Sequence, residues 1–246
     1  MVGLTREESL LSRERANEAF ASIGTPEFEE KNARFAEYSL AHIAERRQHP
    51  RNDFLTVLAG GMYKGVTIDD GTAVQILTAL LMGGHHSTSS GISGTLRYVL
   101  TEDGVRAALD DEPRMLSRII EESLRLTTPL QMFARTAAVS TALGQCPVPQ
   151  GTRLLINYAA ANRDPQQFSD PDKFDLSRQR IPHLAFGAGA HLCGGLHLAR
   201  LEIKTALTRL LNRFPDLHVS GEITDAGLIA GVLMSITALP VAFTPE

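Results

Sequence analysis

The stretch FGAGAHLCGG, residues 186–195, contains a cysteine in a setting that favours chemistry. Cys193 is one of two cysteines in the 246-residue chain, and it follows His191 by two positions. Glycines remove side-chain bulk, so a glycine-rich loop lets a large flat group lie against the backbone. The sequence that follows, LHLARLEIKTALTRLLNRF, has apolar residues at helical spacing. Cys193 therefore comes just ahead of a helix N-terminus, which favours a thiolate, and the pattern predicts a metal ligand or a nucleophile.

Different kinds of site could use this cysteine. A nucleophilic cysteine needs a nearby base, and His191 could serve as one. An iron–sulfur cluster or a structural zinc site needs more cysteines than this chain has. A single thiolate ligand is typical of haem. The loop pattern FGxGxHxCxG has a very low chance of arising at random, and its specified positions are Phe186, Gly187, Gly189, His191, Cys193 and Gly195.

A second candidate lies in LMGGHHSTSSG, residues 81–91. Gly83 and Gly84 each weaken a helix by about 1 kcal/mol relative to alanine, which indicates close packing or a local widening at a functional site. His86 and Ser87 bring a titratable group and a hydroxyl, a combination that suits proton relay to a bound oxygen species. The alternative is a helix kinked for packing whose polar residues face a water pocket.

Two further motifs carry charge. Glu122 and Arg125 in IIEESLRL are spaced i and i+3 on a helix and can form an ion pair. Such pairs are mostly exposed and contribute less than about 1 kcal/mol, but the apolar surroundings here predict burial with further partners. Arg135 could bind the propionate of a haem, although a lone arginine on a strand is usually solvated.

The elements that must position these residues are mostly helices. We expect helices within 5–48, broken near Gly24–Glu27, and over 53–58, 69–101, 116–126 and from the cysteine loop to about 214. A hairpin is predicted from strands 135–142 and 153–158, followed by a turn-rich segment over 162–185. Short strands near 217–220 and 239–243 close the chain. The sequence predicts a mainly α protein with a small β part.

Composition narrows the function classes. The chain is 43% hydrophobic, which suffices for a large core, and its net charge of −4 gives no footprint for nucleic acid or an anionic membrane. No apolar run approaches the roughly 20 residues that span a bilayer. The N-terminus is charged from Arg6 onward, so it does not resemble a secretory signal. Two cysteines make no disulfide framework, so we expect a cytoplasmic protein, with a Cys146–Cys193 bridge as the minor alternative.

Taken in order, these motifs resemble the C-terminal portion of a cytochrome P450 of the bacterial soluble type. The resemblance runs from about residue 40 to the end and is carried by GGHHS, the Glu122–Arg125 helix, FARTA with Arg135, NRDP, FSDPDKFDLSR and the cysteine loop. It implies one truncated haem domain over residues 1–246 with heme b (iron protoporphyrin IX) as cofactor. It also implies that the N-terminal part of the family fold is missing.

The resemblance implies roles for the residues of the loop and its surroundings. Cys193 would be the axial ligand of the haem iron, and Phe186 would pack beside its sulfur. Arg135 and His191 would hold the propionates. Glu122 and Arg125 would stabilise the core behind the haem. The other residues expected at the cofactor are Gly83, Gly187 and Gly195.

On the opposite side of the cofactor, the resemblance implies that Gly84, His86 and Ser87 take part in catalysis. His86 and Ser87 depart from the family, which usually has an acid followed by threonine at these positions. Serine keeps a hydroxyl, whereas histidine titrates near neutrality. A further departure is Lys173, which stands where an arginine commonly completes the network of Glu122 and Arg125.

The implied activity is oxidation of a small hydrophobic molecule by a haem-thiolate monooxygenase that uses O2 and electrons from a ferredoxin. Basic residues around the loop could attract such an acidic donor: Lys173, Arg178, Arg180, Arg200 and Lys204. Residues expected near the substrate are Leu80, Gly83, Leu130, Met132, Phe133 and a turn at 232–234. Because the missing elements would expose apolar surface, a homodimer or a complementary chain is expected. The alternatives are a non-catalytic haem-binding or interaction module, and an oxidoreductase that uses peroxide with His86 as its acid–base group.

Overall fold

A computed structural model describes residues 2–244. The chain divides into two compact units, with the boundary between His86 and Ser87 inside one long helix, α4 (Asp70–Thr101). Each unit has its own hydrophobic core. The single haem domain expected over residues 1–246 stays a prediction.

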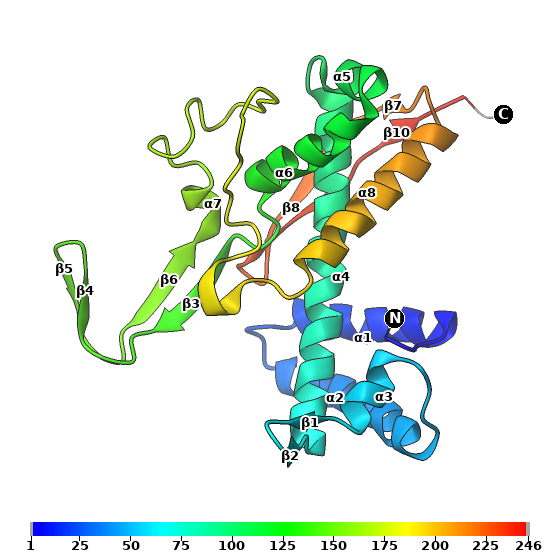
Figure 1. The fold of residues 1–246 in the computed structure, drawn as a ribbon, viewed down its shortest axis with the longest axis vertical. Helices are drawn as coiled ribbons and strands as arrows, with labels where there is room; N and C mark the ends of the chain where they lie inside the picture. The colour runs from blue at the N-terminus through cyan, green and yellow to red at the C-terminus, as the bar shows by residue number, and fades with distance from the viewer. Residues whose placement is uncertain (1, 245–246) are drawn as a thin grey trace. The chain divides into compact units, whose positions relative to one another are not determined.

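The first unit is built from helices around a small core (Figure 1). Its elements are α1 (Arg6–Ala21), α2 (Phe28–Gln48), α3 (Phe54–Ala59), the short antiparallel strands β1 (Met62–Tyr63) and β2 (Val66–Thr67), and the first part of α4. Helix α1 begins where Thr5 and Glu8 bond to each other's backbone N–H groups, an arrangement that satisfies two donors at the helix start. Asp53 caps α3 in a similar way, since its carboxylate accepts from the Thr56 N–H at 2.8 Å.

The second unit holds the remainder of α4, the helices that carry the sequence motifs and several shorter helical segments. These are α5 (Val105–Asp111), a 3₁₀ turn (Pro113–Met115), α6 (Leu116–Thr127), α7 (Tyr158–Ala161), a 3₁₀ turn (Gly189–His191) and α8 (Leu196–Arg213). Helices α4, α6 and α8 share one core, to which Val99, Ile119 and Leu207 contribute. Gly94 permits the close approach of α4 to α6, because a Cβ there would lie 2.5 Å from the Thr127 Oγ1 atom.

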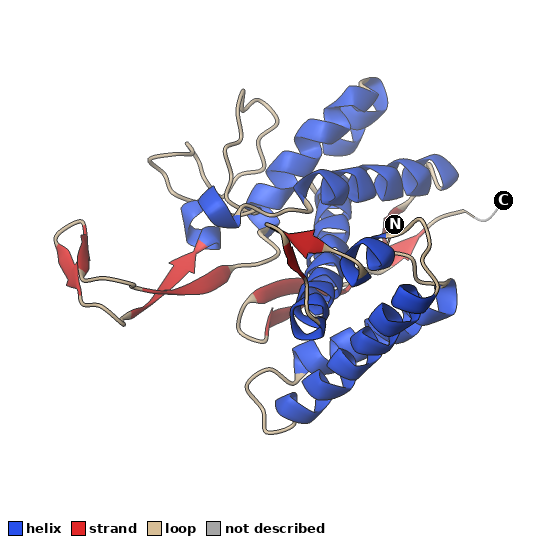
Figure 2. Cartoon of the chain, turned by 60° about the horizontal axis from the view of Figure 1, so that its bottom comes forward, coloured by secondary structure: helices blue, strands red, loops and turns tan. Residues whose placement is uncertain are grey.

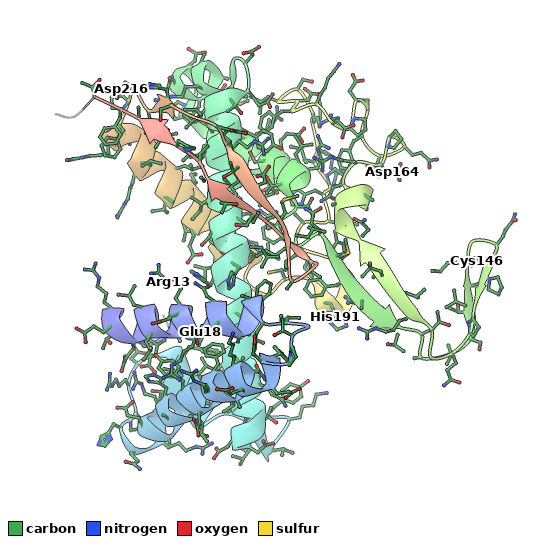
Figure 3. All side chains as sticks on the ribbon, turned by 180° about the vertical axis from the view of Figure 1, so that it is seen from behind. Arg13, Glu18, Cys146, Asp164, His191 and Asp216 are labelled. Atoms are coloured by element: carbon green, nitrogen blue, oxygen red, sulfur yellow. The ribbon has the colours of Figure 1, made fainter. Side chains whose placement is uncertain are left out.

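The strands of the second unit form antiparallel pairs rather than a broad sheet (Figure 2). The pairs are β3 (Met132–Thr136) with β6 (Arg153–Asn157), β4 (Thr141–Leu143) with β5 (Cys146–Val148), β7 (His218–Val219) with β10 (Val241–Ala242), and β8 (Thr224–Ile229) with β9 (Leu233–Ala238). The β3–β6 ribbon projects from the helices and carries the β4–β5 hairpin at its far end (Figure 1). Cys146 lies on this hairpin, away from His191 (Figure 3), and both cysteines are free thiols.

The expected fold class, mainly α with a small β part, is confirmed. Several details are wrong. The strand expected over 135–142 is two strands, since β3 ends at Thr136 and β4 begins at Thr141. Helix α5 and the β8–β9 hairpin were not expected, and the turn expected at 232–234 instead leads into β9, where Leu233 is buried. Among residues 2–244, no helix combines the length and apolar character that a membrane crossing requires.

Candidate functional site

The cysteine loop is folded back on itself by backbone hydrogen bonds. The Cys193 N–H donates to the Phe186 carbonyl at 2.9 Å, and the Leu192 N–H donates to the Gly189 carbonyl at 3.1 Å. Gly187 has φ +68°, a left-handed conformation that side chains rarely adopt. A Cβ at Gly187 would also lie 3.5 Å from the His191 carbonyl oxygen. The sequence therefore uses glycine where the loop turns, and the turn places Cys193 directly ahead of α8.

The surroundings of the Cys193 sulfur suit a large flat ligand. Cys193 is half-buried, and Gly195, the residue that precedes the first turn of α8, is exposed. A Cβ at Gly195 would lie 3.9 Å from the sulfur, and apart from the chain neighbours of each glycine, no described residue lies within 4 Å of a Cβ placed at Gly189 or Gly194. The loop thus presents bare backbone on the side of the thiol. One thiolate donor with an unobstructed backbone collar fits a haem.

A cluster of charged and aromatic side chains packs against this loop. Glu121 of α6 accepts two hydrogen bonds from Arg200 of α8, at 2.6 and 2.7 Å, and its Oε2 lies 3.1 Å from the His183 Nε2. The Arg200 guanidinium lies over the Phe186 ring, 4.6 Å from its centroid. The hydrogen bond to Glu121 raises the pKa of Arg200, and the nearby Cys193 sulfur adds to the rise. A permanent cation therefore lies within electrostatic reach of the candidate ligand.

Glu121 is ionised in this cluster. Burial alone would raise the pKa of its carboxyl, but the hydrogen bonds from His183 and Arg200 outweigh burial and lower the pKa to about 2. Neither Glu121 nor His183 was singled out from the sequence. A glutamate next to Glu122 on a helix resembles an ordinary surface charge, and its partners lie 62 and 79 residues further along the chain.

The pair Glu122 and Arg125 is fully buried, as expected from the sequence. Two hydrogen bonds of 2.7 and 2.8 Å join the guanidinium to the carboxylate. Arg125 also donates to the backbone carbonyls of Asn162, Pro171 and Lys173. The pair thus ties the turn-rich segment 162–175 to α6.

The expectation for Lys173 is wrong. Its ammonium group lies at the surface and pairs with Asp170 at 3.2 Å, so that Lys173 contributes only a backbone oxygen to the network. The second guanidinium comes from Arg178, whose Nε donates to Glu122 Oε1 at 3.0 Å and whose side chain is buried. Arg178 stands five positions after Lys173, at the end of FDLSR, and that motif was the available signal. With Arg178 and Arg200 engaged internally, the expected basic surface cluster reduces to Lys173, Arg180 and Lys204.

The two expected propionate ligands lie in the same unit as Cys193. Arg135 is half-buried on β3, opposite Leu154, and its Nη1 donates to the Ala134 carbonyl at 2.9 Å. His191 is exposed at the end of the 3₁₀ turn in the cysteine loop (Figure 3). Within residues 2–244, neither side chain forms an ion pair with a carboxylate. Both are therefore available to an anionic group.

The expected oxygen-side residues lie on α4, and the boundary between the units falls among them. Gly83, Gly84 and His86 belong to the first unit and Ser87 to the second. The His86 ring stacks on Phe20 of α1, with centroids 4.6 Å apart, and its Nδ1 atom is buried. Burial lowers the pKa of His86, so that the neutral ring is favoured.

The residues expected near the substrate are not gathered by one cavity. A cavity of about 420 Å³ in the second unit has a mixed lining, with Arg97, Tyr98 and Arg163 beside Leu126, Ile236 and Met234, the last from the expected 232–234 segment. Leu130, Met132 and Phe133 are not part of that lining. Phe133 is instead 43% exposed on β3.

Comparison with known proteins identifies the family. A model of the family described as cytochrome P450 matches residues 13–221. The chain is 37% identical over 207 residues to cytochrome P450 107B1 of Saccharopolyspora erythraea, covering 83% of this chain and 51% of that protein. It is 32% identical over 215 residues to steroid C26-monooxygenase of Mycobacterium tuberculosis, covering 87% of this chain and 58% of that protein.

A solved structure of P450BioI, in complex with an acyl carrier protein ligated to hexadec-9Z-enoic acid, has the same arrangement of elements. Its TM-score to this chain is 0.90 at 30% identity, and the match covers 99% of this chain and 64% of that one. The expected likeness to a portion of the P450 fold is therefore confirmed. The chain spans about half the length of the curated relatives that it matches. It belongs to the cytochrome P450 family, whose members bind haem.

Proposed function

We propose that this chain carries the thiolate side of a haem-dependent monooxygenase, in which Cys193 is the ligand of the haem iron. The observation that carries the proposal is the bare glycine collar beside Cys193, set against the N-terminus of α8. A thiolate ligand in that position would face the positive end of the helix dipole. When bound, the haem supplies the oxygen chemistry, which a thiolate ligand promotes.

The remaining residues of the second unit would bind and orient the cofactor. Phe186 and Gly187 shape the loop around the sulfur, and Gly195 places no side chain beside it. Arg135 and His191 make no ion pair within the described chain, which supports their assignment to the two propionates. Charge-assisted hydrogen bonds of this kind are stronger than neutral ones and would fix the orientation of the ring.

On α4, Gly83 and Gly84 would leave room beside the cofactor for dioxygen. Apart from the chain neighbours and the backbone of α4 itself, no described atom lies within 4 Å of a Cβ placed at either glycine, which supports this role. Ser87 would hold or pass a proton through its hydroxyl, and His86 would exchange protons with it. Because the lowered pKa favours a neutral His86, the imidazole would act first as a proton acceptor.

The same neutral imidazole favours a second candidate function. A base next to the oxygen site would take a proton from hydrogen peroxide, so a peroxide-using oxidoreductase is the main alternative. Turnover with peroxide, but not with a ferredoxin and its reductase, would identify it. The remaining alternative, a non-catalytic haem-binding or interaction module, would give no turnover with either system.

The substrate is proposed to be a small hydrophobic molecule and the electron donor a ferredoxin. A steroid and a fatty acyl group appear in the names of a relative and of a solved structure, and both are apolar molecules. Arg180 and Lys204 are exposed near the cysteine loop in sequence and could attract an acidic donor.

We also propose a partner, either a second copy or a complementary chain. Apolar side chains are exposed along the β3–β6 ribbon, with Phe133 at 43%, Leu155 at 61% and Ile156 at 39%. A ribbon of two strands with apolar residues on its surface favours association.

Haem uptake by the 246-residue chain tests the proposal. We expect that the reduced protein binds carbon monoxide with the Soret shift of a thiolate complex. Cys193→Ala should abolish that spectrum, because it removes the proposed ligand. Cys146→Ala is the matched control and should leave the spectrum unchanged, since Cys146 is exposed on a distant hairpin. The same spectrum in Cys193→Ala would overturn the assignment.

A further inference from the structure

The cysteine loop is held at both of its ends by one carboxylate. His183 precedes the loop and Arg200 follows it on α8, and both bond to Glu121 of α6. The His183 side chain is 2% exposed, and the Glu121 side chain is 27% exposed. A contact between α6 and two points that flank the loop limits how far the loop can open.

Phe186 connects Cys193 to this clamp, which consists of Glu121, His183 and Arg200. Its ring lies against the Arg200 guanidinium, at 4.6 Å, and against the His183 ring, with centroids 5.9 Å apart. The Phe186 carbonyl in turn accepts the hydrogen bond of the Cys193 N–H at 2.9 Å. The contacts therefore run from Glu121 through its two partners to Phe186, and from Phe186 to the backbone of the cysteine.

The geometry of the clamp makes it strong for a site that is partly exposed. Both Glu121 oxygens accept from Arg200, an arrangement in which two parallel hydrogen bonds fix the relative orientation of the side chains. An arginine over an aromatic face adds a cation–π contact. The clamp is also separate from the Glu122 network, since the contacts of Glu121 and Glu122 share no side chain.

We propose that Glu121 is a positioning residue that holds Cys193 in place by joining His183 and Arg200 across the base of the cysteine loop. It touches neither the proposed cofactor nor the substrate, and acts through Phe186. The effect of Glu121 on haem ligation rests on the proposed function. Its effect on the position of the loop concerns the chain alone.

Hydrogen exchange of the haem-free chain tests the inference. Glu121→Gln keeps the size of the side chain but removes its charge, so the fold is retained while the clamp weakens. We expect the amide of Cys193, followed in peptides that cover residues 186–195, to exchange about tenfold faster, in line with the loss of a charge-assisted hydrogen bond. Glu121→Asp keeps the charge with a shorter reach and should recover part of the protection.

The matched control is Asp110→Asn. It makes the same carboxylate-to-amide change in an ion pair of α5, where Asp110 bonds to Arg106 at 3.0 Å. Exchange in the cysteine loop should be unchanged in this variant. Equal exchange in the parent chain and in Glu121→Gln would overturn the inference, whether or not the chain binds haem.

A second measurement follows the cofactor. After haem is added, we expect a smaller fraction of Glu121→Gln than of the parent to give the thiolate-type carbon monoxide spectrum. If the parent chain takes up no haem, the proposed function is contradicted. The hydrogen-exchange comparison then tests the positioning role of Glu121 by itself. A parent and a Glu121→Gln variant with the same thiolate fraction contradict the positioning role of Glu121.

Discussion

Glu121 and Glu122 are consecutive residues of α6, but the structure gives them different partners and different burial. Glu122 is fully buried and is bound by two guanidinium groups and the Asp175 N–H. Glu121 is partly exposed and is bound by Arg200 and His183. Successive helical residues point about 100° apart, so one turn of α6 organises two separate segments of the chain.

The two glutamates differ in what they stabilise: Glu122 supports the folded core, and Glu121 supports a loop that must stay accessible to a ligand. The Glu122 network ties the turn-rich segment 162–178 to α6 through buried side chains, among which an unpaired charge would be very costly. The Glu121 clamp holds a loop whose glycines remain open, as a ligand-binding loop must be. The comparison predicts that damage to the first network strongly destabilises the whole fold, whereas damage to the second acts mainly on the loop and costs less stability.

The largest effect is expected from Arg125→Leu. It leaves the Glu122 carboxylate buried with only part of its partners and removes donors from three backbone carbonyls. Breaking a buried pair in this way costs about 3–5 kcal/mol, which is a large share of a typical free energy of unfolding. Urea unfolding followed by circular dichroism measures it. A loss below about 1 kcal/mol would remove the distinction between the two networks.

An intermediate effect is expected from Arg178→Gln. It takes away a charge-assisted hydrogen bond to a buried carboxylate, which costs about 1.5–3 kcal/mol. Lys173→Gln is the matched control and should stay within about 0.5 kcal/mol of the parent, because the Lys173 ammonium is exposed. Urea midpoints of the two variants decide which cation completes the network. A larger loss in Lys173→Gln would restore the expectation drawn from the sequence.

The smallest effect is expected from Glu121→Gln and depends on pH. The pKa of Glu121 falls from an ordinary value of 4.5 to about 2 on folding, so its ionised form stabilises the folded state. That contribution is complete above about pH 4.5 and is lost as the pH falls towards 2. The difference in unfolding free energy between the parent and Glu121→Gln should therefore be constant near neutrality and shrink in acid. A difference that grows on acidification would contradict the ionised clamp.

The cysteine loop and the Glu122–Arg125 pair could be predicted because their signals are local. The loop is specified by closely spaced residues, and the pair follows from i, i+3 spacing among apolar neighbours. Most helices were also predicted, since their apolar residues recur with a clear period.

The missed features depend on contacts distant in sequence or on irregular patterns. The role of Arg178 depends on how residues 162–178 wrap against α6, which no short motif describes. The β8–β9 hairpin carries register shifts near Asp225 and a glycine, Gly227, at φ +67°, so its alternation of side chains is broken. Helix α5 has only seven residues, too few for a helical period to stand out.

The position of Cys146 has a practical consequence. An exposed thiol beside the turn of a projecting hairpin is readily oxidised to a disulfide between two molecules (Figure 3). Such a covalent dimer, formed in air during purification, would imitate the association proposed for the β3–β6 ribbon. Measurements of molecular mass should therefore use Cys146→Ser or a reducing agent, and the same thiol provides a single attachment point for a spectroscopic label in a Cys193→Ala background.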